Sequence, residues 1–315
     1  MSLINKFWEM KHFQMGMFLL VILLGSWPTT ANAQLQVPLV RGDIGLQGGS
    51  QPPPGVYLTG LLYFYDTHTI VDQNGIHRKR VGLSQWFGGI DLMFVAKKKI
   101  LGGNYSAQVV LPITNVAADT PFKNNVTGVG YSDTYVQPIN LGWHKKRYDA
   151  ITWYGLYIPT GRFTDGADNN SGLGMWSHEF GAGTTVFLNE KKQWHAAITG
   201  TYNIQSHIKD TNKKAGDVVS LEGGVGRAFC SGLCNAGLDY YTQWKVTQDQ
   251  FANLPTGFLG KHRYYGIGPE VNGTIPINKT TLAIFKLAAF HELGDRVAFQ
   301  GNSIFMSVTW AKLSH

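Results

Sequence analysis

The residues with the clearest catalytic potential are histidines that stand next to a carboxylate or a serine. A histidine beside a nucleophile could act as a general base, and one beside a carboxylate could help to bind a metal ion. His178–Glu179 and His291–Glu292 are of the second kind, and Ser177–His178 is of the first. Because adjacent side chains on a strand point to opposite faces, neither member can act with its neighbour in these strand-like segments. We therefore predict no catalytic site and no metal site from them.

The two cysteines of the chain, Cys230 and Cys234, are separated by only three residues. In an exported protein, a close pair favours a disulfide, whereas a structural zinc site usually needs four ligands and no second pair is nearby. We predict a disulfide across a short turn, with free thiols or a metal site as the alternatives. Because the loop is short, the bond would add little stability.

The first 33 residues have the layout of a secretory signal peptide. Lys6 and Lys11 precede the apolar run 15–25, and Ala31–Asn32–Ala33 is a small-x-small cleavage site. The run is too short to span about 30 Å of hydrocarbon with margin. We expect a cleaved signal peptide over residues 1–33. Export argues against nucleic acid as a partner, so the formal net charge of +7 is interpreted as loop and turn charge.

The composition indicates a membrane protein that is built from strands. Only 15% of the residues are charged and 13% are aromatic, whereas about a quarter of the residues in a soluble domain are charged. Beyond residue 33, no apolar run approaches the roughly 18 residues of a helical span. Side chains alternate with a period of two in 194–205, 235–245 and 303–310. This pattern is typical of strands in outer-membrane barrels.

About twelve such strands can be placed along the chain. They are expected near 55–66, 82–97, 102–112, 126–144, 148–159, 174–188, 194–205, 216–230, 235–245, 262–277, 282–292 and 303–310. The connections between them alternate between long and short, as extracellular loops and periplasmic turns do in outer-membrane barrels. We predict an all-β fold over residues 55–315: a single up-and-down antiparallel transmembrane β-barrel.

Residues 34–54, before the first expected strand, are rich in glycine and end in Pro52–Pro53–Pro54. Consecutive prolines favour extended polyproline II and do not occur in the interior of a sheet. Two placements are open for this segment. It could be a periplasmic strap that leads into the barrel, or a plug that lies inside the barrel mouth.

The alternation also predicts which polar side chains face the lumen. The lumen-lining candidates are His195, Asn203, Asp239, Tyr241, Gln243 and Lys286. Among them Tyr241 could stack on an aromatic ring. The alternative is that these side chains only fill a polar interior, as in other small barrels.

Six segments, spread over nearly all of the exported chain, form a pattern that is specific in its order and spacing. They are QPPPGVY at 51–57, GVGYSDTYVQP at 128–138, LGWH at 141–144, YIPTGRF at 157–163, GIGPE at 266–270 and FHE at 290–292. Together they resemble the outer-membrane family named for the meta-pathway of phenol degradation, the MetA-like transporters. One departure is the tail, where five residues follow Trp310, although such barrels often end on an aromatic residue.

The resemblance implies a function but supplies no catalytic residue. It implies a passive outer-membrane channel or transporter for small hydrophobic or aromatic compounds, without a cofactor and linked to aromatic catabolism. The expected partners are outer-membrane lipid, a small apolar or aromatic solute and, during insertion, the barrel-assembly machinery. The rival hypothesis is a non-conducting structural or interaction barrel. A barrel lipase or acyltransferase is less favoured, because the sequence has no Gly-x-Ser-x-Gly elbow.

Overall fold

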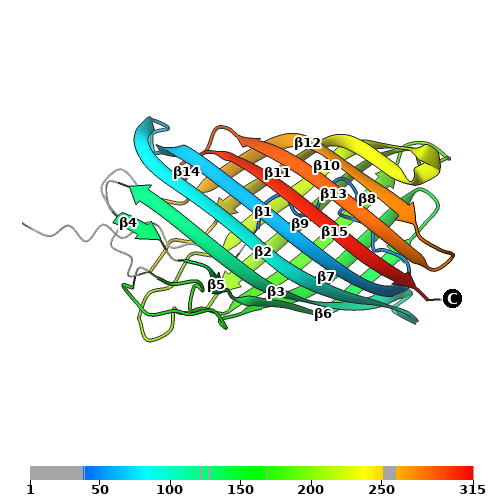
Figure 1. The fold of residues 1–315 in the computed structure, drawn as a ribbon, viewed down its shortest axis with the longest axis horizontal. Coiled ribbons are helices and arrows are strands. Elements are labelled where there is room, and N and C mark those ends of the chain that lie inside the picture. The colour runs from blue at the N-terminus through cyan, green and yellow to red at the C-terminus, as the bar shows by residue number, and fades with distance from the viewer. Residues whose placement is uncertain are drawn as a thin grey trace, which may run out of the picture. The chain divides into compact units, whose positions relative to one another are not determined.

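The fold is known from a computed structural model that describes residues 38, 40–120, 123–126, 128–167, 169–250 and 260–314. The predicted signal peptide lies outside these residues. The described chain forms an antiparallel β-barrel (Figure 1). Its long strands are β1 (Gly55–Val71), β2 (His77–Ile100), β3 (Gly103–Thr120), β6 (Thr134–His144), β7 (Tyr148–Ile158), β8 (Ser177–Phe187), β9 (Trp194–Gln205), β10 (Val218–Phe229), β11 (Cys234–Lys245), β12 (Arg263–Pro276), β13 (Thr281–Glu292) and β15 (Asn302–Leu313).

The barrel closes between its first and last strands. Each long strand pairs with the long strands before and after it, and β1 pairs with both β2 and β15. The β1–β15 seam runs without interruption from Gly55 opposite Leu313 to Asp66 opposite Asn302. Three short strands, β4 (Lys123–Val126), β5 (Gly130–Tyr131) and β14 (Ala298–Phe299), extend the sheet locally. The predicted all-β, twelve-stranded, up-and-down barrel is confirmed.

Two predicted loops are wrong in length, because strands continue past the apolar part of the wall. The predicted loop 67–81 is only 72–76, since β1 and β2 stay paired as far as Val71 and His77. Likewise, β3 runs into the predicted loop 113–125 and ends at Thr120. Backbone pairing does not require apolar side chains, so the ladder continues where the hydrophobic alternation, which marks lipid contact, has stopped.

The predicted strand 126–144 is divided at Asp133, between β5 and β6. The Asp133 carboxylate accepts hydrogen bonds from the backbone amides of Gly161, at 3.0 Å, and Leu173, at 2.7 Å. Both donors belong to the long connection between β7 and β8. The side chain therefore ties this loop to the end of β6 at the point where the ladder is interrupted.

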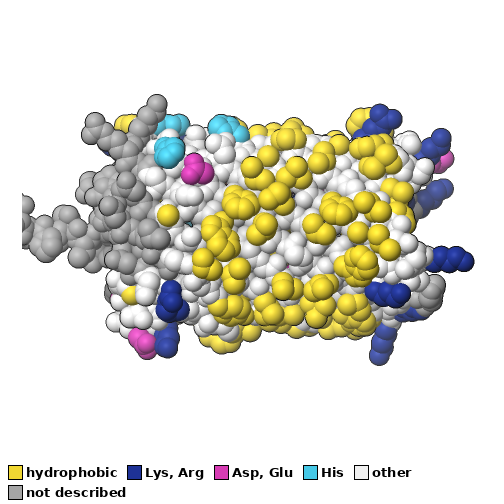
Figure 2. Space-filling model, in the orientation of Figure 1, with side chains coloured by type: hydrophobic (Ala, Val, Ile, Leu, Met, Phe, Trp, Pro, Cys, Tyr) yellow, Lys and Arg dark blue, Asp and Glu magenta, His cyan; other side chains and the backbone are white. Residues whose placement is uncertain are grey.

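The two faces of the wall differ as the alternation predicts. On β11, Leu238 is 53% exposed, whereas Asp239 and Tyr241 are 1% and 2% exposed. The buried set points into the barrel and the exposed set points outward, so the predicted alternation in 235–245 is confirmed. Figure 2 shows apolar side chains over the wall between the two ends of the barrel. That surface matches the apolar band of an outer-membrane barrel.

The two ends of the barrel differ in their connections and in charge. Connections of two to six residues, at 101–102, 145–147, 188–193, 230–233 and 277–280, lie at the end that holds the C-terminus (Figure 1). Lys and Arg gather at this end in Figure 2. We call this group the basic rim; it consists of Lys97, Lys98, Lys99, Lys145, Lys146, Arg147, Lys191 and Lys192. Among the described residues, no helix is long and apolar enough to cross a membrane.

A charge on the outer face should destabilise the barrel more than the same charge in the lumen. We expect Leu238→Arg to lower the free energy of unfolding by about 2–4 kcal/mol, because the side chain lies near the middle of β11 on the lipid side. The matched control is Ser307→Arg on β15, which points into the lumen cavity. Guanidinium unfolding in lipid vesicles measures both variants. Equal losses would contradict the assigned faces.

Candidate functional site

The chain that precedes β1 runs through the inside of the barrel. From Pro54 at the turn end, it passes the inner wall and contacts strands on several sides of the lumen. The Gln51 amide donates to Ser106 Oγ on β3 at 2.9 Å, and Lys286 Nζ on β13 donates to the Asp43 carbonyl at 2.9 Å. We call residues 40–54 the lumen segment. Carboxylates on β10 and β12 also accept hydrogen bonds from the backbone amides of this segment.

Glycines let the lumen segment lie close to the wall. A Cβ atom on Gly49 would lie 2.0 Å from the Thr184 backbone on β8, so only glycine fits at this approach. Gly42 and Gly45 adopt positive φ angles of 79° and 87°, which non-glycine residues rarely take. The glycine content of the segment is therefore explained by its path along the inner wall.

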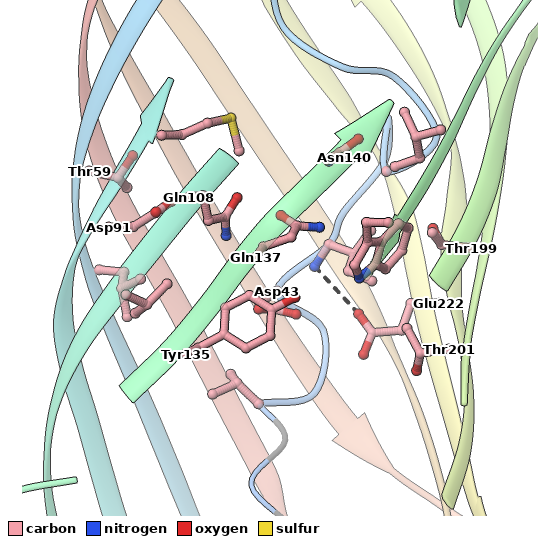
Figure 3. A pocket seen from close by; sticks show the side chains of 18 of the residues that line it. Asp43, Thr59, Asp91, Gln108, Tyr135, Gln137, Asn140, Thr199, Thr201 and Glu222 are labelled. Carbon is pink, nitrogen blue, oxygen red and sulfur yellow. Dashed lines mark hydrogen bonds between the residues drawn. The ribbon is translucent and has the colours of Figure 1, made fainter. Parts of the chain in front are cut away.

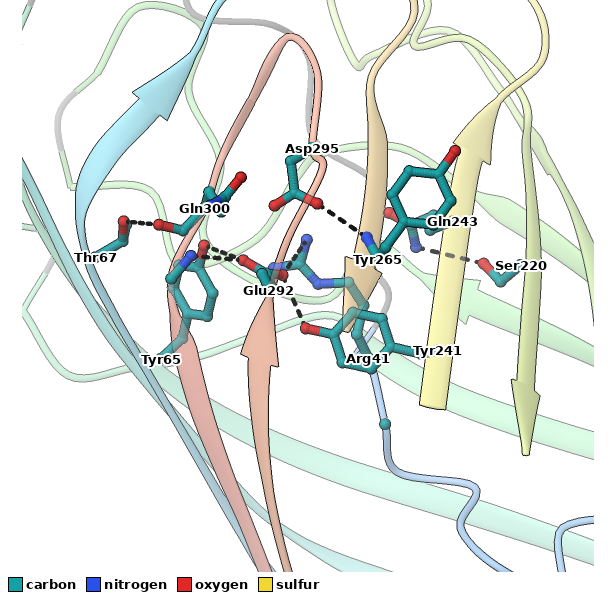
Figure 4. Close-up of polar contacts among 12 residues, drawn as sticks. Arg41, Tyr65, Thr67, Ser220, Tyr241, Gln243, Tyr265, Glu292, Asp295 and Gln300 are labelled. Carbon is teal, nitrogen blue, oxygen red and sulfur yellow. Dashed lines mark hydrogen bonds and ion pairs between the residues drawn. The ribbon is translucent and has the colours of Figure 1, made fainter. Parts of the chain in front are cut away.

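Arg41 fixes the far end of the lumen segment, near the loop end of the barrel (Figure 4). Its guanidinium lies 3.4 Å from Glu292, which is fully buried. Glu292 also accepts the hydroxyls of Tyr65, at 2.7 Å, and Tyr241, at 2.8 Å. The Arg41 Cζ atom lies 3.9 Å from the ring centroid of Tyr264, within the range of a cation–π contact. A buried charge is thus paired and hydrogen-bonded, as burial requires.

Beside the lumen segment lies a cavity of about 400 Å³ (Figure 3). Its wall combines rings, neutral polar groups and charges. The aromatic members are Phe87, Tyr135, Trp153, Tyr157 and Phe305; the neutral polar members include Gln108, Gln137, Asn140, Thr199 and Thr201; and the charged members are Asp43, Asp91, Glu179, Glu222 and Lys286. Such a mixture of apolar surface with a few polar groups is typical of small-molecule sites.

Two of these carboxylates are held firmly in place. Glu179 accepts hydrogen bonds from the Tyr135 hydroxyl at 2.8 Å, from the Trp153 indole at 2.8 Å and from the Asn203 amide at 3.1 Å. Glu222 accepts the backbone amide of Gly42 at 3.1 Å. The first set of contacts joins β6, β7, β8 and β9, so it fixes the cavity wall, while the second fixes the lumen segment.

Asp43 is the charged group that the lumen segment contributes to the cavity. Its side chain remains accessible to the lumen, although protein surrounds it. The loss of surrounding water raises the pKa of Asp43 to about 6, while the charge of Lys286 acts in the opposite direction and that of Glu179 reinforces the rise. The pKa of Asp43 is therefore closer to neutrality than that of a free aspartate.

The structure places all six predicted lumen-lining residues on the inner face. Gln243 and Lys286 line the cavity, and Asn203 supports it through Glu179. Tyr241 binds Glu292 instead, away from the cavity lining. His195 and Asp239 are buried in the wall, 0% and 1% exposed. Their role in binding a solute stays a prediction.

The acidic groups of the cavity were not predicted from the sequence. Glu179 stood out only as the neighbour of His178, and Glu222 did not stand out at all. The structure turns His178 outward, where its Nδ1 atom lies 2.8 Å from the Tyr154 hydroxyl, and Glu179 inward. A signal was present for Glu222, because Val219 and Leu221 beside it mark the lipid side and place Ser220 and Glu222 on the lumen side.

The predicted disulfide is not formed, since Cys230 and Cys234 are free thiols at the turn between β10 and β11. The cross-strand partner of Cys234 is Phe229, and Cys230 has left the ladder with a φ angle of 51°. Cys230 thus leaves the ladder, although the two thiols lie within hydrogen-bonding reach of each other. Among the described residues, no group of three or more His, Cys, Asp or Glu side chains could hold a metal ion.

Asp295 closes the wall above Glu292, in the connection between β13 and β14 (Figure 4). Its Oδ1 atom accepts the Tyr265 amide at 2.9 Å, but Oδ2 is buried without a partner. Burial, and after it the charge of Glu292, raises the pKa of Asp295 to about 8. The side chain is thus best accommodated in its protonated form.

Comparison with known proteins adds a family and a fold. The sequence matches the family described as "Putative MetA-pathway of phenol degradation" over residues 66–308. No curated protein matches the chain. A crystal structure of an outer membrane channel from Pseudomonas putida F1 is similar, with a TM-score of 0.68 and 12% identity over 87% of this chain and 99% of the other. The likeness shows the fold alone, because the identity is low.

Two autotransporter barrels are more distantly similar. The β domain of the Bordetella autotransporter BrkA has a TM-score of 0.45 and 13% identity over 84% of this chain and 100% of the other. The transport unit of the autotransporter AIDA-I from Escherichia coli has a TM-score of 0.45 and 10% identity, over 83% of this chain and 90% of the other.

Loss of the Arg41 anchor should loosen the lumen segment. We expect Arg41→Ala to increase hydrogen exchange at the amides of Gly42 and Leu46 by about tenfold. Without the Arg41 ion pair, the end of the segment is free to move, so the hydrogen bonds from these amides to carboxylates open more often. The control is Arg78→Ala, which removes an ion pair between an exposed arginine and the buried Asp72, in the connection between β1 and β2. Hydrogen exchange is measured by mass spectrometry. Unchanged exchange in Arg41→Ala would contradict the anchoring role of Arg41.

The raised pKa of Asp295 predicts the direction of a pH effect. Because the folded protein binds this proton more tightly than the unfolded chain does, the stability contributed by Asp295 falls as the pH rises from about 4 to about 8 and then levels off. We expect the melting temperature of the wild type to fall between pH 6 and pH 9, and Asp295→Asn to reduce that fall. If the melting temperatures of the wild type and Asp295→Asn change in parallel with pH, Asp295 is not the group that causes the fall.

Proposed function

Because the chain belongs to the family described as "Putative MetA-pathway of phenol degradation", we propose that it is a passive outer-membrane channel for small aromatic compounds. The observation that carries the proposal is the lumen cavity of about 400 Å³, whose lining combines aromatic rings with polar groups. For comparison, a cavity of about 150 Å³ accepts benzene. The volume is thus sufficient for a substituted ring.

The barrel supports this proposal through its two faces. The outer wall is apolar and suits lipid, whereas the inner wall is polar and suits a hydrated path. Tyr135 and Tyr157 lie side by side in the cavity wall, with ring centroids 4.6 Å apart. Such rings can contact a planar solute without forming a strong bond to it. Weak binding of this kind lets a solute leave as readily as it enters.

A second candidate function is favoured by the lumen segment itself. The segment contacts β3, β10, β12 and β13 and so fills part of the lumen. This is expected for a barrel that does not conduct and serves a structural role. The two candidates differ in one consequence. A channel conducts ions or solutes in its native state or after the segment is loosened, whereas a structural barrel does so in neither.

Planar-bilayer recordings of the purified full-length protein test the proposal. We expect discrete conductance steps, which Arg41→Ala enlarges because the loosened segment occupies the lumen for less time. Uptake of phenol by cells that lack the gene should be slower than by the parent strain and should recover with the wild-type gene. If neither protein conducts and uptake is unaffected, the structural barrel is the better description.

A further inference from the structure

The charges that line the lumen cavity are unbalanced. Four carboxylates line it, and Lys286 is the one basic side chain in its described lining. Lys286 Nζ is already 3.2 Å from Oε2 of Glu270, a carboxylate outside that lining. Its charge is therefore largely compensated. Carboxyl groups therefore outnumber basic groups in a space from which protein displaces much of the water.

The neutral polar groups of the cavity add a second, independent preference. Gln51 and Asn140 are 4% and 7% exposed, and each has a side-chain oxygen without a hydrogen-bond partner. The Thr199 hydroxyl, on a side chain that is 1% exposed, is also unpartnered. All three line the same cavity. An amide oxygen can only accept, and a hydroxyl can accept or donate, so N–H or O–H donors on a ligand could satisfy all three groups, whereas a carboxylate could bond only to the hydroxyl.

The lumen already holds one cation in this manner. The Arg41 guanidinium lies among the rings of Tyr65, Tyr241 and Tyr264, at 5.3, 5.9 and 3.9 Å from their centroids, and pairs with Glu292. Ring faces and a carboxylate together suit a positive group with an organic body. The cavity repeats these two components, with Tyr135, Trp153 and Tyr157 beside its carboxylates.

We propose that the lumen selects solutes by charge, admitting organic cations and uncharged hydrogen-bond donors and rejecting aromatic carboxylates. This inference rests on the proposed channel function and adds the charge class of its solutes. Rings of acidic side chains make other pores cation-selective. A carboxylate solute would meet like charges in a space of reduced dielectric, where repulsion is several times stronger than in water.

The basic rim does not reverse this preference. Its lysines and arginine are at the turn end, on connections and strand ends that face solvent. Charges in water are screened within about 10 Å at 0.1 M salt. The cavity carboxylates lie inside the wall, where less salt and water surround them. Selection is therefore set in the lumen, while the rim affects only the approach of a solute.

Reversal potentials of the full-length protein in planar bilayers test the inference. Under a tenfold KCl gradient, we expect potassium to be favoured over chloride by roughly fivefold or more. Asp91→Asn, which removes one cavity carboxylate, should about halve this ratio. The matched control, Asp66→Asn, alters an aspartate whose side chain is 63% exposed and should leave the ratio unchanged. Ratios at or below one, in a protein that conducts, would overturn the inference and leave the channel function intact.

Permeation of paired aromatic probes gives a second measurement. In liposome swelling, benzylammonium and benzyl alcohol should enter several times faster than benzoate, which has a similar ring and the opposite charge. Asp91→Asn should narrow this difference and Asp66→Asn should not. Equal rates for the cation and the anion would overturn the charge selection. A complete lack of current and of swelling would overturn the proposed channel function, and this inference with it.

Discussion

The structure depends on the pairing of every backbone polar group within the wall of the barrel. Lipid offers no hydrogen bonds, so a sheet that crosses it can have no open edge. The uninterrupted seam between β1 and β15 meets this requirement and makes the sheet continuous. Closure of the barrel then determines where side chains lie. It separates a face toward lipid from a face toward the lumen, and it holds side chains from distant strands around one space.

The lumen shows what that enclosure permits. Carboxylates from β2, β8 and β10 would repel one another in an apolar core, yet here they share a polar space with the lumen segment. Hydrogen bonds from Tyr135, Trp153 and Asn203 to Glu179 hold one of them rigidly across four strands. The repulsion between these like charges is offset by the stability of the barrel, which comes from backbone pairing and lipid contact.

Much of this fold could be predicted from the sequence, because lipid imposes a period of two on the strands that contact it. The alternation around Leu238 and Asp239 gave the direction of both side chains. It failed for the ends of β1, β2 and β3, where pairing continues without lipid. It also could not give the partners of Glu179, since Tyr135 and Asn203 approach it only after the sheet has curved. The path of the lumen segment has no periodic signal, because its contacts exist only in the closed barrel.

The covalent link between the lumen segment and β1 has a kinetic meaning. A segment joined at Pro54 to the first residue of the wall remains a neighbour of its own binding groups even when it detaches. Its effective concentration, as for other short tethered ligands, is on the order of millimolar, and its return is a unimolecular step. A solute that uses the same groups must compete with this internal ligand. In the proposed channel, a solute that is below this concentration and binds these groups no more tightly than the segment does would pass alongside the segment and not displace it.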